Sequence, residues 1–462
     1  MPMWACDFKG CSKPAVRTGD CILCNRHLCS SHLQTPFHQC PSWEDAEHYD
    51  PAAREAEKKE METLFQKINK EALAARASEL RNGICCSIPA FRYDRTRQSS
   101  VMGGMNYHID IVFEDGVVWL ARIRRFNATS PPPPLRDHIF QSEFATMKFL
   151  EEIAVPTPKV FDFALESHDN SVGVGYMLVE KMAGTSLRWS IASPGQRRKI
   201  VEQLADIFIE LRKYPFDKMG CLGTSSSHRI GAFARESLTD FNGSHMSPLG
   251  PYSSLQEYHT SSIRLILDLI IREEMYSQNP IDAYLIHRFL LDLIPSVLPS
   301  QGDLGHQYFL KHADDKGDHI LVDKDYNITA IIDWEWAYTA PEAIAFNSPI
   351  GLLPVNEFYD GLNTLGEEEK LLAEIFEKKG EPSLAQTVRD GRLQHRFAFC
   401  CGYDLSDWKG FLGLFKGLRD AVSIDQGLEW EEWKQIALER YQGDDGFKCL
   451  LSKACVMKTG NC

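Results

Sequence analysis

The chain has 462 residues, roughly three times the length of a typical domain, so two or three compact units are expected. Hydrophobic residues make up 44% and charged residues 25%, which excludes a wholly disordered or collagen-like chain. The net charge of −14 argues against a dedicated nucleic-acid or anionic-membrane binder. No apolar run approaches the ~20 residues of a membrane-spanning helix, and no secretory signal pattern is visible at the start. We therefore expect a cytoplasmic protein, with the nucleus as an alternative.

Cysteine and histidine residues cluster at the beginning of the chain. Six of the 14 cysteines lie within residues 1–40, and in a reducing compartment such a cluster favours metal ligands over disulfides. Zinc prefers four thiolate or imidazole ligands, so eight such residues suffice for two closed structural sites. The eight candidate ligands are Cys6, Cys11, Cys21, Cys24, Cys29, His32, His38 and Cys40.

The spacing of these ligands, C-x4-C-x9-C-x2-C-x4-C-x2-H-x5-H-x-C, resembles the AN-one-type zinc finger over residues 6–40. The resemblance implies a cross-brace that holds two structural zinc ions, with no open position for catalysis and with a surface for a protein partner. His27 falls outside the pattern. The implied sets are Cys6, Cys11, Cys29 and His32 for one ion, and Cys21, Cys24, His38 and Cys40 for the other.

A connector follows the finger. The stretch Ala52–Leu80 contains no glycine or proline and has apolar residues at helical spacing, which predicts a single long helix that ends at Asn82-Gly83. A spacer that packs on the next domain is favoured over a partner-binding helix.

The pattern then changes to short strands. Tyr107–Phe113 alternates, Asp115-Gly116 supplies a turn, and Val117–Ile123 returns as a β-prone strand. Arg122 and Arg124 share one face of the return strand, where a cation could meet nucleotide phosphates.

Two glycines precede this hairpin. Gly103 and Gly104 would let the backbone approach phosphates, although a Gly-Gly turn is weak evidence alone. After the hairpin, the four consecutive prolines in Asn127–Leu135 predict an exposed loop.

Next, Asp137–Ile153 has the spacing of a helix, with Glu143 placed to meet a cation on the strand. Tyr176–Glu180 reads as a buried strand that leads through Lys181 to a hinge at Met182.

The strongest chemical signal lies in residues 310–336. The β-prone runs Ile320–Val322 and Ile328–Ile332 predict a hairpin, with Asp314 just before it and Asp333 just after it. Phosphoryl transfer needs an acceptor-orienting base, divalent metal on the phosphates and cations for the developing charge. Asp314, Asp333 and Lys316 would supply these parts, whereas the neighbouring Asp315 is expected to be solvated.

Residues from about 99 to 340 resemble the aminoglycoside phosphotransferase and choline kinase group of small-molecule kinases. The order of parts matches: Gly-Gly turn, cationic strand, helix with a glutamate, hinge, His-x-Asp loop and Ile-Asp-Trp-Glu. The resemblance implies a protein-kinase-like fold, and it makes His312 a support of the loop. The implied roles are Asp314 as catalytic base, Asp333 as magnesium ligand, Glu143 as partner of Arg122 (with Arg124 as the runner-up), and Gly103, Gly104, Glu180 and Met182 as nucleotide contacts.

One departure from the family pattern concerns the metal. The position of the metal-binding asparagine is occupied by His319, and imidazole is a poorer ligand for magnesium than an amide or carboxylate oxygen. Asp318 or a water could substitute, the site could prefer manganese, or the activity could be weak or absent.

Together these features predict an α+β, bilobal, protein-kinase-like fold with a small β-rich N-lobe and a large helical C-lobe. The segments are a finger (1–45), a helical connector (46–83), the N-lobe (84–182) and the C-lobe (183–462). Within the C-lobe, Cys221–Pro251 reads as a long loop. The expected function is ATP- or GTP-dependent transfer of the γ-phosphate to a hydroxyl of a small molecule. The alternative is a weak or inactive pseudokinase adaptor that acts through nucleotide and finger interactions.

Overall fold

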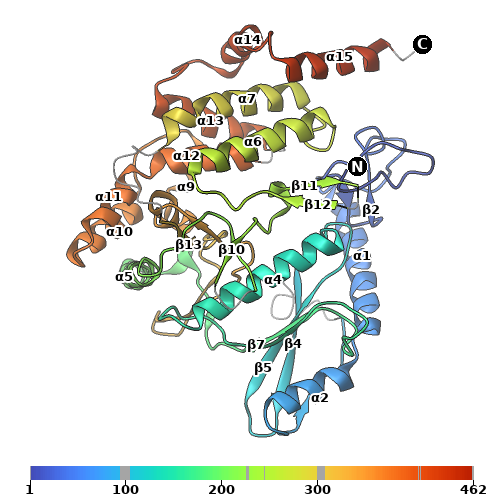
Figure 1. Ribbon diagram of the computed structural model, residues 1–462, viewed down its shortest axis with the longest axis vertical. Coiled ribbons are helices and arrows are strands. Elements are labelled where there is room, and N and C mark those ends of the chain that lie inside the picture. Colours follow the sequence, from blue (N-terminus) through green and yellow to red (C-terminus); the bar gives the residue numbers. More distant parts are fainter. Residues whose placement is uncertain are drawn as a thin grey trace.

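The computed structural model describes residues 2–93, 105–224, 228–243, 245–298, 307–403, 405 and 407–459. A sheet-containing part and a helical part are stacked on each other (Figure 1). The N-terminal finger lies at their side, next to β11 (Thr239–Asn242) and β12 (His245–Pro248). This arrangement confirms the predicted α+β fold with a β-rich N-lobe and a helical C-lobe. The four segment boundaries given above remain predictions.

The finger is built from turns around one short hairpin, β1 (Asp20–Cys21) and β2 (Arg26–His27). Its own core is small: Leu28 and Cys29 are fully buried, and the Phe8 ring stacks on His32 at 3.9 Å between centroids. The apolar surface buried in this core is too small to offset the conformational entropy lost when about 40 residues fold. The segment therefore needs another source of stability.

The connector forms two helices, α1 (Ala46–Lys67) and α2 (Lys70–Leu80), so the prediction of one long helix was wrong. The chain turns because Ile68 adopts an extended conformation and is buried, while the Asn69 amide donates to Val172 O at 2.9 Å. The Asn69 side chain then caps α2. The predicted end at Asn82-Gly83 is confirmed, since both residues have positive φ.

Both connector helices pack on the N-lobe, as the spacer interpretation predicted. Met61, Leu64 and Leu73 are buried in one cluster with the apolar face of the sheet. Charged side chains add to the contact between α1 and the N-lobe, where Glu60 pairs with Arg125 at 2.8 Å.

The N-lobe sheet is antiparallel, with the strand order β3-β4-β5-β7-β6. Alternate residues of β4 are buried from Tyr107 to Phe113, as the period-2 pattern predicted, and Gly116 makes the turn with φ +83°. The strands are β3 (Cys86–Ser87), β4 (Asn106–Phe113), β5 (Val118–Arg124), β6 (Val160–Ala164) and β7 (Tyr176–Glu180).

Helix α4 (Pro133–Leu150) crosses the sheet and contacts β6 (Figure 1). It begins inside the proline run, because proline is tolerated in the first turn, where the amide would have no intrahelical partner. Pro131 and Pro132 are buried, so the prediction of an exposed loop over Asn127–Leu135 was wrong.

The lobes are joined through a short strand, β8 (Thr185–Ser186). It pairs with β14 (Ile320–Val322), which forms a hairpin with β15 (Ile328–Ile331). Gly184, with φ +114°, precedes it, and a Cβ there would lie 2.8 Å from Val322 O. Only glycine fits this approach. The hinge segment is thus attached to the hairpin that carries the candidate catalytic residues.

The C-lobe is mainly helical, with two large apolar clusters in which Trp334 and Trp433 are almost fully buried. No helix within the described ranges is long and apolar enough to cross a membrane. Its longer helices are α5 (Pro194–Leu211), α6 (Leu255–Ile271), α7 (Pro280–Val297), α10 (Glu367–Lys378), α11 (Pro382–Asp390), α12 (Arg392–Gly402), α13 (Trp408–Val422), α14 (Trp430–Arg440) and α15 (Asp445–Thr459). The shorter elements are β13 (Phe309–Lys311), β16 (Tyr338–Ala340), α8 (Glu342–Ala345) and α9 (Val355–Tyr359).

The segment Cys221–Pro251 is not a plain loop, which corrects its prediction. Its described residues form two short antiparallel pairs. These are β9 (Cys221–Leu222) with β10 (Ile230–Gly231), and β11 (Thr239–Asn242) with β12 (His245–Pro248).

The finger contacts both lobes. On the C-lobe, the side chain of Arg17 is buried: Nε donates to Glu274 Oε2 at 3.3 Å and Nη1 to Thr239 O at 2.8 Å. On the N-lobe side, His27 Nε2 donates to Ala128 O at 2.8 Å, in the segment between β5 and α4. The finger therefore bridges the two lobes.

The Arg17 contact provides a test of this bridge. We expect Arg17→Met to lower the free energy of unfolding by about 3 kcal/mol, because the buried Glu274 carboxylate loses one of its two ion pairs. Lys13→Met is the matched control, since Lys13 pairs with Glu273 at the surface and should cost less than about 1 kcal/mol. Chemical denaturation of both variants measures the difference, and equal losses would contradict the bridge.

Candidate active site

The guanidinium of Arg122 on β5 is the centre of a buried charge cluster. It pairs with Glu143 on α4, donates to Asp333 Oδ1 at 2.8 Å, and lies 3.5 Å from Glu335 Oε2. The Asn106 amide oxygen completes its shell, accepting from Nη2 at 2.9 Å when the amide is oriented to satisfy both groups. The structure thus brings the strand cation, the helix glutamate and the Asp-Trp-Glu segment together.

The carboxylates around Arg122 differ in their environments. Burial raises the pKa of Glu143 to about 7, although the charge of Arg122 opposes this shift. Burial also raises the pKa of Asp333, but the positive charge of Arg122 and its hydrogen bond outweigh burial and hold this pKa below the usual value. Asp333 is also 55% exposed at its side chain, so it remains ionised and accessible.

Arg124, the runner-up phosphate cation, has a different partner. Its Nη1 donates to Glu335 Oε2 at 2.6 Å, and both side chains are more than nine-tenths buried. The sequence analysis assigned no partner to Glu335, so this ion pair was not anticipated. Arg122 and Arg124 are two residues apart, so both side chains lie on one face of β5. This spacing was the sequence signal that both arginines could meet the same acidic segment.

His312 connects the two candidate catalytic loops. Its Nδ1 accepts from the Asp314 amide at 3.2 Å, and its Nε2 donates to Ile332 O, next to Asp333, at 2.9 Å. Burial lowers the pKa of His312, which keeps the ring neutral, as this pattern of one acceptor and one donor requires. One imidazole therefore fixes Asp314 relative to Asp333, in agreement with its expected supporting role.

Lys316 lies among the acidic side chains of these loops. Its ammonium is 3.0 Å from Asp314 Oδ2, and this bond raises its pKa, with Asp318 and Asp333 adding to the effect. Asp314 is thus the carboxylate in direct contact with the Lys316 ammonium.

The backbone of Asp333 is in the left-handed region, with φ +63°. A non-glycine residue adopts this conformation at a cost of about 1–3 kcal/mol, and such residues concentrate at functional sites. The neighbours hold it in place, because the Ile332 amide donates to His319 O and the Trp334 indole donates to Ile331 O.

His319 packs inside the loop. Its ring stacks on His312 at 4.2 Å between centroids, and its Nδ1 accepts from the Gly317 amide at 3.3 Å. Burial lowers its pKa to about 3, so the ring is neutral and carries its proton on Nε2. A ring in this state has no free lone pair for a metal, so ligation by His319 would require a different tautomer.

Asp315 is buried, so the expectation that it is solvated was wrong. Its carboxylate accepts from Lys311 Nζ and from the Ile350 amide, each at 3.0 Å. Burial would raise the pKa of Asp315, but Lys311 and the Ile350 amide hold it below the usual value. Asp315 therefore anchors the loop that carries Asp314 to the C-lobe.

The predicted nucleotide contacts lie partly beyond the described residues. Gly103 and Gly104 fall outside them. Glu180 ends β7, where its amide donates to Lys159 O at 2.8 Å, and Met182 follows in the hinge segment. Thr329 fixes this segment, since its hydroxyl donates to Ala183 O at 2.6 Å.

In the finger, the ligand-type atoms form the two sets that the resemblance implied. Within each set the atoms lie within 4.8 Å of one another. Cys29 Sγ is 3.3 Å from His32 Nδ1, Cys11 Sγ is 3.9 Å from Cys29 Sγ, and Cys24 Sγ is 3.7 Å from His38 Nε2. A tetrahedron with Zn–S of about 2.3 Å and Zn–N of about 2.1 Å requires separations of this size. The donor sets therefore fit structural zinc, and His27 lies outside both.

The chain resembles known phosphotransferases in one segment. Residues 117–344 match the family described as "Phosphotransferase enzyme family". This segment begins after the finger and the connector, and it contains Arg122, Glu143, Asp314 and Asp333.

Two curated relatives come from Aspergillus fumigatus, and both are described as subtelomeric hrmA-associated cluster proteins. They are 29% and 28% identical over 136 residues, which are 28% of this chain and 24% of each relative. The match thus spans about a quarter of the length of these relatives.

Similar solved structures include aminoglycoside phosphotransferases. The GDP complex of aminoglycoside 2'-phosphotransferase-IIIa has a TM-score of 0.42 at 15% identity, over 77% of this chain and 99% of that one. A thermostable mutant of aminoglycoside phosphotransferase APH(4)-Ia with ADP and hygromycin B has a TM-score of 0.40 at 13% identity, over 77% and 100%.

The buried Asp315 gives a prediction for the loop. Asp315→Ala should lower the free energy of unfolding by about 3 kcal/mol, because Lys311 loses its counter-charge and the Ile350 amide loses its acceptor. Asp318→Ala, at an exposed position three residues away, should stay within about 0.5 kcal/mol of the native chain. Urea denaturation compares them, and a neutral Asp315→Ala would contradict the anchoring role.

Proposed function

We propose that this protein is a phosphotransferase that moves the γ-phosphate of ATP or GTP to a hydroxyl of a small-molecule acceptor. The observation that carries the proposal is the coupling of Asp314 and Asp333 through His312, with the Lys316 ammonium paired to Asp314. The match of residues 117–344 to a phosphotransferase family supports the same reaction class.

In this proposal each side chain has one task. Asp314 accepts the hydrogen bond of the acceptor hydroxyl, orients it and takes its proton as the phosphoryl group is transferred. Lys316 leaves its pair with Asp314 to neutralise charge on the transferred group. Arg122, held in place by Glu143, binds the phosphates of the nucleotide.

A divalent metal, magnesium or manganese, would neutralise the β- and γ-phosphates. Asp333 offers an ionised, exposed carboxylate for it, and Asp318 offers an exposed second one. His319 suits this role less well, because its Nδ1 already accepts from the Gly317 amide.

The second candidate is a pseudokinase adaptor that binds nucleotide without efficient transfer. The orientation of His319 favours it, since the family's metal-binding asparagine is replaced by a ring without a free lone pair. The two candidates differ in turnover, not in fold.

An activity screen separates them. The full-length protein is incubated with a metabolite extract, magnesium or manganese, and ATP or GTP, and new phosphomonoesters are identified by mass spectrometry. We expect Asp314→Asn to lower kcat by about 10²–10⁴-fold with little change in the KM for nucleotide, because it removes the base and leaves the phosphate contacts. Asp325→Asn, in the exposed hairpin turn, is the control. Nucleotide binding without turnover that depends on Asp314 would establish the adaptor instead.

We also propose that the finger holds two structural zinc ions and that its outer face serves a protein partner. Part of its surface is already used by the two lobes, through Arg17 and His27. The aromatic side chains of Phe37 and Trp43 are exposed and are available for contact with a partner.

Metal content tests the zinc sites. Elemental analysis of the purified protein should give two zinc ions per chain, and Cys29→Ser should lose one of them, because a neutral hydroxyl replaces a thiolate ligand. Cys449→Ser, at an exposed cysteine outside both sets, should retain both ions. Metal-free protein that keeps the same stability would refute the structural role.

A further inference from the structure

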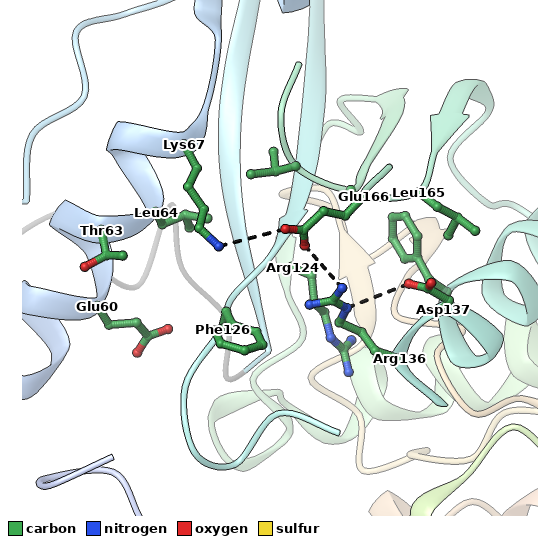
Figure 2. A pocket seen from close by; sticks show the side chains of 13 residues that line it. Glu60, Thr63, Leu64, Lys67, Arg124, Phe126, Arg136, Asp137, Leu165 and Glu166 are labelled. Carbon is green, nitrogen blue, oxygen red and sulfur yellow. Dashed lines mark ion pairs between the residues drawn. The ribbon is translucent and has the colours of Figure 1, made fainter. Parts of the chain in front are cut away.

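A second pocket lies outside the catalytic loops. It is enclosed by α1, the end of β5, the start of α4 and the turn between β6 and β7 (Figure 2). Its apolar lining consists of Leu64, Phe126, Phe140, Leu165 and Val174. Neither Asp314 nor Asp333 lines it, so the proposed phosphotransfer does not account for it.

Three cations line the same pocket, Lys67, Arg124 and Arg136, together with the carboxylates of Glu60, Asp137 and Glu166. Glu60 is paired with Arg125 outside this set, and Asp137 lies 3.8 Å from Arg136. Glu166 is shared by two of the cations, at 3.8 Å from Lys67 and 3.2 Å from Arg136, and it is 40% exposed (Figure 2). An exposed carboxylate shared in this way contributes little stability and can turn to solvent when another anion takes its place.

Arg124, one of the residues that line this pocket, has a buried donor that is not used. Its side chain is only 8% exposed, and its Nη1 is bonded to Glu335. Its Nη2 has no hydrogen-bond partner among the residues that the structure describes. A buried guanidinium nitrogen without an acceptor is costly, and such a group in a pocket wall indicates a missing acceptor.

Phe126 supplies an apolar surface beside these cations. Its ring is 52% exposed, and Lys67 and Arg136 lie over it at 5.5 and 5.7 Å from the centroid. Cations held on an aromatic face are partly desolvated and oriented for an anion. The ring itself offers a contact for an apolar group.

We propose that this pocket binds a small molecule that carries one anionic group, a carboxylate or a phosphate monoester, on an apolar body. The anion accepts from Arg124 Nη2 and takes the place of Glu166 as the partner of Lys67 and Arg136. The apolar body lies against Phe126 and Leu165. Because Arg124 Nη1 holds Glu335, which in turn lies beside Arg122, the ligand contacts the outer side of the active-site charge cluster without entering the nucleotide site.

Phenyl phosphate is a suitable probe, because it combines both features. Its binding to the full-length protein is measured by calorimetry with excess magnesium and AMP-PNP present, so that phosphate contacts at Arg122 are occupied. We expect Lys67→Met combined with Arg136→Gln to weaken binding about tenfold or more, since two charge-assisted contacts are lost. Lys148→Met is the matched control, because Lys148 is similarly exposed and pairs with Glu151 outside the pocket.

A further variant and a second probe make the outcome of this binding experiment decisive. Phe126→Ser, a change at an exposed ring, should weaken phenyl phosphate but not inorganic phosphate, and it serves if the double variant does not fold. Benzoate in place of phenyl phosphate distinguishes a carboxylate ligand from a phosphate ligand. Unchanged affinity in both pocket variants, or complete displacement by AMP-PNP, would overturn the proposal. If AMP-PNP itself does not bind, the proposed function fails, yet the variants still decide the pocket.

Discussion

The burial of the Arg122 guanidinium constrains the whole active site. A charge taken out of water must be compensated by opposite charges at close range, and here one cation collects carboxylates from α4 and from the segment after β15. The N-lobe sheet, the crossing helix and the C-lobe hairpin are thereby held at one point. A displacement of any of these elements would leave at least one buried charge uncompensated.

The parts that could be predicted from the sequence depend on short-range patterns. The alternation in β4, the turn at Gly116 and the hairpin that separates Asp314 from Asp333 each lie within a few consecutive residues. The same holds for the finger, where ligand spacing implied the two sets that the structure brings together. Strand periodicity also placed Arg122 and Arg124 on one face, although it could not distinguish between their partners.

The features that were missed depend on residues distant in the chain. The break between α1 and α2 is stabilised by Val172, about one hundred positions away from Asn69, so helical spacing alone could not reveal it. Asp315 is buried because Lys311 and Ile350 enclose it, whereas its neighbours in the sequence are polar. The proline run was predicted to be an exposed loop. Its first two members, Pro131 and Pro132, are buried by tertiary contacts, which the local sequence does not reveal.

The bridge formed by the finger also limits how the lobes can move. The segment before β8 joins the lobes at one place and the Arg122 cluster holds them at another. The finger adds a further attachment, because Arg17 fastens it to the C-lobe and α1 continues it along the sheet (Figure 1). A change in the relative orientation of the two lobes must therefore strain or break the contacts of the finger.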